Sequence, residues 1–172
     1  ENTGSAFAID NSCPCDFCMP LEAGLNLVSV PRYVEVGGST TASAVFNLSN
    51  TETCDCWDGC TGEWSTLPPN QMQVVPDRAY FVYKANAETL CLNETTYLGK
   101  QELCADSWAM VGFPSPDPMT VTEFRAASNL GNGFLTAWQW NGGWYPTDNM
   151  VPYRGYVLWM TDDGWMPGMI DG

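Results

Sequence analysis

Two stretches of the chain repeat one motif, and this repeat limits the fold more than any other feature. Residues 75–84 and 151–160 both read Val-Pro-x-Arg-small-Tyr and continue as an apolar run of aromatic and β-branched residues. Proline fixes φ and blocks ladder pairing, so this pattern is typical of the entry into a buried strand. The repeat therefore predicts one β unit written twice.

A second pair of stretches supports the repeat. Residues 24–31 and 107–114 are both apolar runs that end at a proline, Pro31 or Pro114. Pro31 precedes Val75 by 44 residues, whereas Pro114 precedes Val151 by 37. The seven additional residues fall where a cysteine-rich segment lies, so we interpret residues 51–62 as an insertion into the first unit. The expected organisation is an arm over residues 1–20 that holds the first cysteine cluster, a first β unit over 21–100 and a second over 101–172.

The remaining pattern predicts an all-β protein with at most one short helix. We expect two related units in tandem, each resembling a β-sandwich or barrel and stabilised by disulfides. Residues 121–130 have helical spacing, residues 135–140 read as a strand, and Asn141-Gly142-Gly143 is a hairpin turn signal. Residues 42–48 fit either a strand or a short helix, and residues 86–100 read as a turn-rich connection.

Charge and composition exclude several classes of function. The net charge is −14 with six basic residues, and histidine is absent. Such a surface repels phosphate groups, so nucleic acid is not expected as a partner. The absence of histidine removes Ser-His-Asp and Cys-His catalysis together with histidine metal sites. The carboxylates show no distinctive spacing, so we expect no enzyme.

Eight cysteines form two clusters and one further pair. They are Cys13, Cys15 and Cys18, then Cys54, Cys56 and Cys60, then Cys91 and Cys104. Thiolate metal sites usually draw on C-x-x-C pairs, so disulfides are the favoured interpretation over zinc or iron–sulfur. Neighbours in C-x-C bond each other poorly, so the clusters are expected to lie in two exposed loops and to bond each other or another chain. Cys91 and Cys104 are a candidate private pair worth about 3 kcal/mol by loop entropy. The connectivity itself stays open.

Cysteine usage and two glycosylation sequons favour an extracellular setting. The sequons begin at Asn47 and Asn93. No apolar run approaches the roughly 20 residues of a membrane helix, so membrane insertion is not expected. We take the chain, which begins at Glu1, as a mature form whose signal peptide has been removed.

Several further residues are candidates for binding or structural roles. Asp162 and Asp163 are weak candidates for calcium, the only cofactor that the sequence suggests, although Asp-Gly is first of all a turn signal. The motif residues Arg78 and Arg154 are expected to hold a carboxylate or loop carbonyls. Their neighbours Tyr80 and Tyr156 begin the two buried strands. Trp138, Trp140 and Trp144 could form a glycan platform, but we favour core or interface.

The apolar run at residues 24–31 and the two Val-Pro-x-Arg-small-Tyr motifs resemble repeat domains of archaeal cell-surface (S-layer-like) proteins. Those domains carry a Gly-Trp-Asn-Leu strand that ends in proline and a later Gly-Tyr-aromatic-apolar-aromatic strand. Leu25 stands where tryptophan is usual, and Ala79 replaces glycine in the first copy. The cysteine clusters, acidity and small size are similar to the major sheath protein family of filamentous methanogenic archaea.

This resemblance implies a β-rich subunit that stacks into a tubular sheath with disulfide reinforcement. We therefore expect a structural cell-envelope protein that assembles with copies of itself through sheet edges and aromatic surfaces. The alternative is a secreted carbohydrate-binding module with a tryptophan platform.

Overall fold

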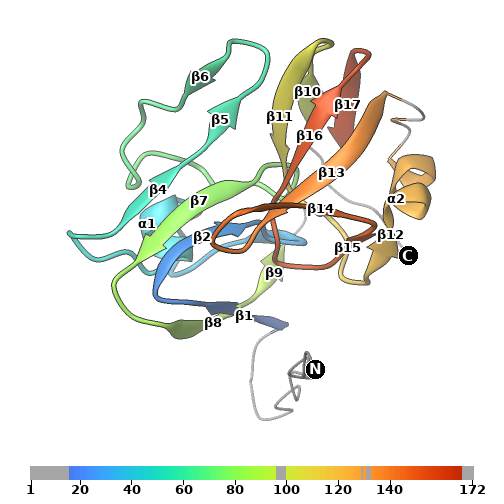
Figure 1. Cartoon of the computed structure of the whole chain (residues 1–172). Coiled ribbons are helices and arrows are strands. Elements are labelled where there is room, and N and C mark those ends of the chain that lie inside the picture. Colours follow the sequence, from blue (N-terminus) through green and yellow to red (C-terminus); the bar gives the residue numbers. More distant parts are fainter. Residues whose placement is uncertain (1–15, 96–99, 129, 131–132, 168–172) are drawn as a thin grey trace.

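The computed structural model describes residues 16–95, 100–128, 130 and 133–167, and in these residues the fold is almost entirely β (Figure 1). Seven small sheets and two short helices are present in this part of the chain. They divide into a first unit and a second unit, each built around the strand that follows one copy of the motif. The all-β fold class and the two related units are thereby confirmed, but two short helices are present where at most one was expected.

The first unit is centred on a three-stranded sheet of order β2-β7-β4. The strand pairs β1–β8, β3–β9 and β5–β6 and helix α1 complete it. Its elements are β1 (Phe17–Leu21), β2 (Gly24–Val28), β3 (Tyr33–Val34), α1 (Ala42–Val45), β4 (Thr53–Asp55), β5 (Trp57–Asp58), β6 (Glu63–Trp64), β7 (Tyr80–Lys84), β8 (Glu88–Leu92) and β9 (Glu94–Thr95).

The second unit is centred on a four-stranded sheet of order β11-β16-β13-β14. The pairs β12–β15 and β10–β17 and helix α2 complete it. Its elements are β10 (Lys100–Leu103), β11 (Ser107–Val111), β12 (Met119–Thr120), α2 (Val121–Ala127), β13 (Phe134–Trp140), β14 (Trp144–Thr147), β15 (Asn149–Met150), β16 (Tyr156–Met160) and β17 (Gly164–Pro167). The short helix and the hairpin at residues 141–143 were both predicted and are confirmed.

The two central sheets pair their strands in the same register. Val28 of β2 lies opposite Tyr80 of β7, and Val111 of β11 lies opposite Tyr156 of β16. Both pairings run without a shift over five residues. Pro76 and Pro152 occupy matching places before β7 and β16. The repeat seen in the sequence is therefore also a repeat of hydrogen-bonded structure.

The motif tyrosines make the same hydrogen bond in both units. The backbone N–H of Val75 donates to the hydroxyl of Tyr80 at 3.0 Å, and that of Val151 donates to Tyr156 at 2.7 Å. Each ring is fully buried. The tyrosine thus closes the turn that begins with Val-Pro and brings the chain into the central strand, which explains why the motif contains it.

The helices also begin alike. Thr41 and Thr120 precede α1 and α2 with extended backbone. In both units the first helical N–H donates to a backbone carbonyl, that of Met72 or Asp148, at 2.8 Å. In α2 a reciprocal capping box between Thr120 and Glu123 adds to this anchor. Residues 42–48, left open between strand and helix, therefore begin with one helical turn.

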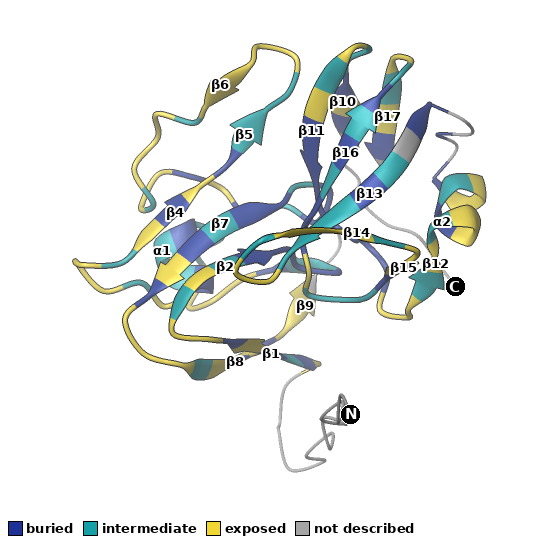
Figure 2. Ribbon diagram, viewed as in Figure 1, coloured by how far each residue is buried: buried dark blue, intermediate teal, exposed yellow. Residues whose placement is uncertain are grey.

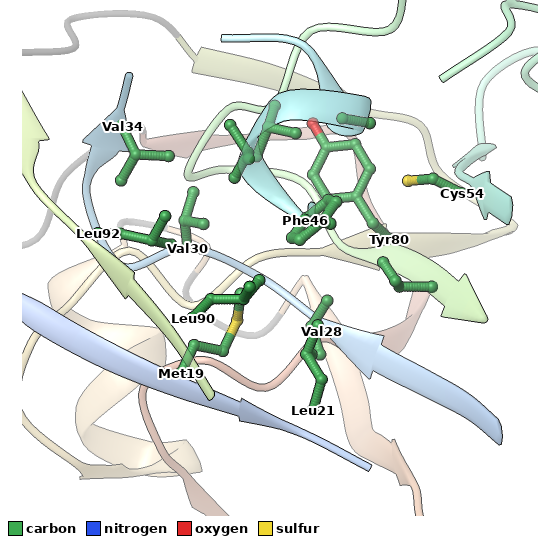
Figure 3. Packing of buried hydrophobic residues seen from close by; sticks show 14 of the residues in the cluster. Met19, Leu21, Val28, Val30, Val34, Phe46, Cys54, Tyr80, Leu90 and Leu92 are labelled. Carbon is green, nitrogen blue, oxygen red and sulfur yellow. The ribbon is translucent and has the colours of Figure 1, made fainter. Parts of the chain in front are cut away.

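Each unit has its own apolar core. The first is drawn in part in Figure 3, where side chains from β1, β2, β7 and β8 meet below helix α1 around Tyr80. The second gathers around Tyr156, Phe113 and Phe124. Two cores of this kind agree with small units that each bury one face of a twisted sheet.

The two units exchange strand contacts reciprocally. Val28 of the first unit bridges Arg154 of the second, and Val111 of the second bridges Arg78 of the first. Val28 matches Val111 in the repeat, and Arg154 matches Arg78. The two units therefore make equivalent contacts with each other. Such an exchange is what an approximate twofold axis between the units produces.

Backbone hydrogen bonds repeat this exchange. Ser29 N–H donates to the Tyr153 carbonyl at 3.0 Å, and Gly112 N–H donates to the Asp77 carbonyl at 2.9 Å. The buried Ser29 hydroxyl also donates to the Arg154 carbonyl at 2.8 Å. The units are therefore joined by paired backbone as well as by side-chain packing.

Residues 86–100 correct one prediction. They were expected to form a turn-rich connection, but β8 and β9 occupy much of this segment. Leu90 and Leu92 alternate with Thr89 and Cys91, so β8 buries one face against the core and pairs with β1. Residues 17–20, which were assigned to the N-terminal arm, likewise lie in a strand, because β1 pairs with β8. The boundaries assigned to the arm and the two units stay predictions.

Candidate functional site

Each central sheet has one face on its own core and a second face directed away from it. In β7 the buried residues Tyr80 and Val82 alternate with half-buried Phe81 and exposed Tyr83. An antiparallel sheet with one solvated face usually places polar residues there. Here those positions hold aromatic and aliphatic side chains in both units. We call this surface, formed by the outward residues of β2, β7, β11, β16 and the two tryptophan hairpins, the outer face.

The centre of the outer face lies where the two units meet. Leu27, Ala79 and Met110 are buried there and form a third apolar cluster. Leu27 and Met110 occupy matching positions in β2 and β11. The cluster therefore lies at the approximate twofold axis between the units. Aromatic side chains surround it.

A continuous chain of rings covers this centre. Phe81 packs against Trp140 and Trp144 of the second unit, with ring centroids 5.8 and 5.9 Å apart, and against Trp64 of the first at 6.0 Å. Edge-to-face pairs of this separation are favourable beyond their burial. Phe81 thus connects the tryptophans of the two units into one aromatic surface.

The two tryptophan hairpins are equivalent. Trp57 and Trp64 lie opposite each other in β5–β6, as Trp140 and Trp144 do in β13–β14. The ring centroids are 5.4 and 5.3 Å apart, and both pairs are edge-to-face. Of the predicted residues, Trp140 and Trp144 are thus half of a repeated arrangement, whereas half-buried Trp138 lies opposite Pro146. Trp57 and Trp64 were missed, although the spacing Thr-x-x-x-Trp at residues 53–57 and 136–140 could have indicated them.

The flanks of the outer face are matched as well. Leu25 lies opposite Tyr83 in the first unit, and Trp108 lies opposite Trp159 in the second. Five large side chains remain between 44 and 49% exposed, as the yellow patches of Figure 2 illustrate for several of these strands. They are Leu25, Trp64, Tyr83, Trp108 and Trp144.

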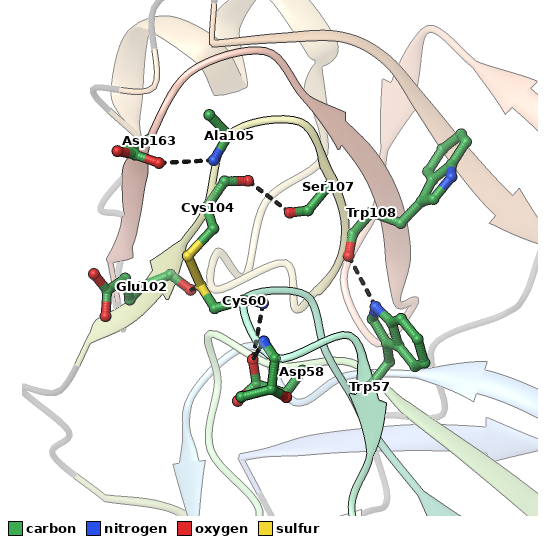
Figure 4. The surroundings of a disulfide bond; sticks show 10 residues. Trp57, Asp58, Cys60, Glu102, Cys104, Ala105, Ser107, Trp108 and Asp163 are labelled. Carbon is green, nitrogen blue, oxygen red and sulfur yellow. Dashed lines mark hydrogen bonds between the residues drawn. A yellow bond between two sulfur atoms is a disulfide. The ribbon is translucent and has the colours of Figure 1, made fainter.

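A disulfide fastens the first tryptophan hairpin to the second unit (Figure 4). Cys60 at the hairpin tip bonds Cys104, which follows β10. Beside it the indole N–H of Trp57 donates to the Trp108 carbonyl at 2.9 Å. The candidate pair of Cys91 with Cys104 is therefore wrong. Cys91 lies in β8, which pairs with β1, whereas the β5–β6 hairpin brings Cys60 to Cys104.

Two cysteines expected in an exposed loop are instead buried. Cys54 lies in β4 opposite Val82, inside the first core, and Cys56 follows it. Burial raises the pKa of both thiols, most strongly at Cys54. A neutral, buried thiol is a poor nucleophile, so these cysteines behave as apolar core residues. Segment 51–62 was expected to be an inserted loop, but it contains β4 and β5 and belongs to the sheet and hairpin framework of the first unit.

The other described cysteines are Cys18 and Cys91. Cys18 and Cys91 face each other across β1 and β8, with their sulfur atoms 2.9 Å apart. Cys13 and Cys15 lie outside the described residues.

The motif arginines take other partners than expected. Arg78 lies beside the Cys56 thiol, whereas the Arg154 side chain is exposed and its carbonyl accepts the Ser29 hydroxyl. Among the described residues no carboxylate pairs with either guanidinium. The repeated arginine therefore connects the two units through its backbone, which forms the bridges to Val28 and Val111.

The sequon asparagines are both accessible. Asn47 and Asn93 are exposed, and the Asn47 amide donates to Glu88 at 3.1 Å. Their glycosylation stays a prediction.

The calcium candidates are exposed and already engaged in part. Asp162 and Asp163 form the turn before β17, and one Asp163 oxygen accepts the Ala105 N–H at 2.7 Å. Within residues 16–95, 100–128, 130 and 133–167, no group of three or more acidic or cysteine side chains is arranged to hold a metal. Calcium binding therefore stays a proposal without support from geometry.

Comparisons with known proteins do not extend this description. No family model, curated protein or solved structure matches the chain. In the part of the chain that the structure describes, the helices are too short to cross a membrane.

Proposed function

We propose that the chain is a non-enzymatic structural subunit that assembles with copies of itself into an extracellular sheath or surface layer. The resemblance to archaeal sheath and surface proteins suggests the setting. The outer face is the observation that carries the proposal. It supplies an attachment surface whatever the organism of origin.

The outer face has the composition of a protein interface. Aromatic residues are enriched where interfaces are fully buried, and large contiguous apolar patches on a monomer mark contact sites. Here exposed Trp108 and Tyr83 flank a centre that Phe81 and Leu27 already fill. A second copy could bury the exposed rings without rearrangement of either core.

The outer face is better suited to contact between copies than the sheet edges are. The edge strand β14 contains Pro146, and the pairs β1–β8 and β10–β17 contain Pro20 and Pro167. Proline lacks the N–H that an added strand requires and is a common means of blunting an edge. We therefore assign self-association mainly to aromatic contacts, with disulfides as reinforcement.

The acidic charge sets the conditions for assembly. Copies that each carry a net charge of −14 repel one another at low ionic strength. Salt or divalent cations should screen this repulsion and strengthen association. Apolar contact between copies supplies the attraction, and cations reduce the repulsion that opposes it.

Sedimentation velocity at increasing protein and salt concentration tests the proposal. The wild type should form species heavier than 18.9 kDa, and the variants Tyr83→Ser and Trp108→Ser together should shift it towards monomer. Trp165→Ser is the matched control, because Trp165 is 49% exposed but lies on β17, outside the outer face. Equal association of all these proteins would contradict an assembly role for the outer face.

Glycan binding is the second candidate. Exposed Trp144 and Tyr145 are neighbours at the start of β14, and such rings suit stacking on sugars. The edge-to-face geometry of Trp140 and Trp144, at 73°, argues against one flat platform. Polysaccharide binding that is lost in Trp144→Ala, with unchanged sedimentation, would favour this alternative.

A further inference from the structure

We propose that Cys18 and Cys91 are a site of disulfide formation across the β1–β8 strand pair. The two residues are direct partners in the antiparallel register, and their sulfur atoms are 2.9 Å apart. A disulfide requires a sulfur separation of about 2.05 Å, so closure needs a movement of less than about 1 Å. This inference stands on strand geometry and does not depend on the proposed function.

The backbone places the pair in a suitable position. Directly opposed residues of antiparallel strands have Cα atoms roughly 4.5–5.5 Å apart, inside the range that disulfides adopt. The register is fixed by the opposite face, where Met19 and Leu90 are neighbours in the core. A slip by one residue would expose these side chains, so Cys18 and Cys91 stay opposed.

The pair is also accessible to a reagent. Cys91 is exposed and Cys18 is half-buried. Both project from the face of the strand pair that turns away from the core. Cys54 and Cys56, by contrast, are buried. A soluble oxidant therefore reaches Cys18 and Cys91 in the folded protein and leaves the buried thiols unchanged.

The chemistry is ordinary thiol–disulfide exchange with a small disulfide such as oxidised glutathione. One thiolate attacks a glutathione sulfur, which forms a mixed disulfide and releases one reduced glutathione. The second thiolate attacks the protein sulfur of the mixed disulfide and releases the other. The protein loses two thiol protons and two electrons, and one oxidised glutathione becomes two reduced molecules.

The bond would tie the N-terminal strand to the first unit. Cys18 and Cys91 are 73 residues apart in sequence, so the link closes a long loop. β1 directly follows residues 1–15, which contain Cys13 and Cys15. A covalent clasp would therefore hold that end of the chain to the sheet. By loop entropy, the oxidised protein should have a Tm higher by roughly 10 °C.

Peptide mapping after glutathione treatment tests the proposal in the full chain. The folded protein is incubated with oxidised glutathione, its remaining thiols are alkylated before and after unfolding, and its peptides are identified by mass spectrometry. We expect a peptide pair joined through Cys18 and Cys91, with Cys54 and Cys56 alkylated only after unfolding. The Tm should rise by roughly 10 °C on oxidation in the wild type and should not rise in Cys91→Ser.

Two outcomes would overturn the proposal. Cys91 could remain alkylatable in the oxidised, folded protein, which shows that the opposed thiols do not bond. Cys18 could instead be joined to Cys13 or Cys15, which shows that the cluster bonds within itself. The variant with Cys13→Ser and Cys15→Ser separates these cases, because the Cys18–Cys91 peptide pair should form in it as in the wild type.

Discussion

Gly155 of the second motif copy lies directly against Ala79 of the first. A Cβ atom added at Gly155 would come within 2.5 Å of the Ala79 Cβ and 3.0 Å of the Leu27 Cγ. The small residue of the Val-Pro-x-Arg-small-Tyr motif is therefore small in both copies because the copies touch each other there. The motif encodes contact between the units as well as the entry into a strand.

Gly155→Ala should destabilise the protein by about 1–3 kcal/mol, because an additional methyl group has no room in the packed centre. Urea denaturation measures the free energy of unfolding. Ala79→Gly in the same chain removes the closest clash and should recover part of the loss. Gly143→Ala is the control, since its Cβ would meet ordinary contacts at 3.5 Å. Equal stability of Gly155→Ala and wild type would show that the units do not meet as described.

Tyr80→Phe and Tyr156→Phe should each cost about 1–3 kcal/mol. Either change leaves the N–H of Val75 or Val151 without its acceptor in the turn before a buried strand. Chemical denaturation of the two variants should give similar losses, because the bonds are equivalent. The control is Tyr83→Phe, whose exposed hydroxyl closes no turn. A large loss for only one of the two motif tyrosines would argue against the equivalence.

Glu52 should make stability fall in acid. Its carboxylate accepts the Ser49 N–H, pairs with Lys84 at 2.9 Å and accepts the Ala85 N–H, which lowers the pKa of Glu52 from 4.5 to about 2. The unfolded chain then binds the proton first as pH falls, so this contribution is complete above pH 4.5 and is lost towards pH 2. Denaturation at stepped pH should show a shallower decline in Glu52→Gln. Glu63→Gln, a charge-matched change in an exposed hairpin, should keep the wild-type slope, and an unchanged slope in Glu52→Gln would disprove the assignment.

Cys60→Ser and Cys104→Ser should each lower the free energy of unfolding by about 4 kcal/mol by loop entropy, since the two cysteines are 44 residues apart. The double variant should lose no more than either single one, because one bond is broken in all three. Thermal denaturation compares them. Additive losses would mean that the two cysteines do not bond each other.

The central frame could be predicted from sequence because it rests on local signals. Pro76 and Pro152, the tyrosines that follow and the apolar alternation of residues 80–84 and 156–160 locate β7 and β16. The helix at 121–127 and the hairpin at 141–143 were likewise readable from spacing and turn chemistry. Such patterns report which face of an element is buried, and both units use them in the same way.

The partners of remote segments could not be predicted. Cys18 meets Cys91, and Cys60 meets Cys104, only because of how the sheets pair, and no local pattern records those pairings. Cys54 reads as a loop cysteine until β4 places it opposite Val82. Of the outer face, only Trp138, Trp140 and Trp144 were singled out as a possible interface, and the rest was missed for a similar reason. Trp57 and Phe81 lie far from Trp140 in sequence and become neighbours only through the reciprocal contact of the units.

Electron microscopy of the purified protein at moderate salt is the decisive test of self-assembly through the outer face. We expect ordered tubes or sheets for the wild type and their loss when Tyr83→Ser and Trp108→Ser are combined, while circular dichroism shows the β fold unchanged. Trp165→Ser should assemble like the wild type. Dispersed particles of monomer size for the wild type at every protein and salt concentration, or undiminished assembly of the outer-face variant, would contradict it.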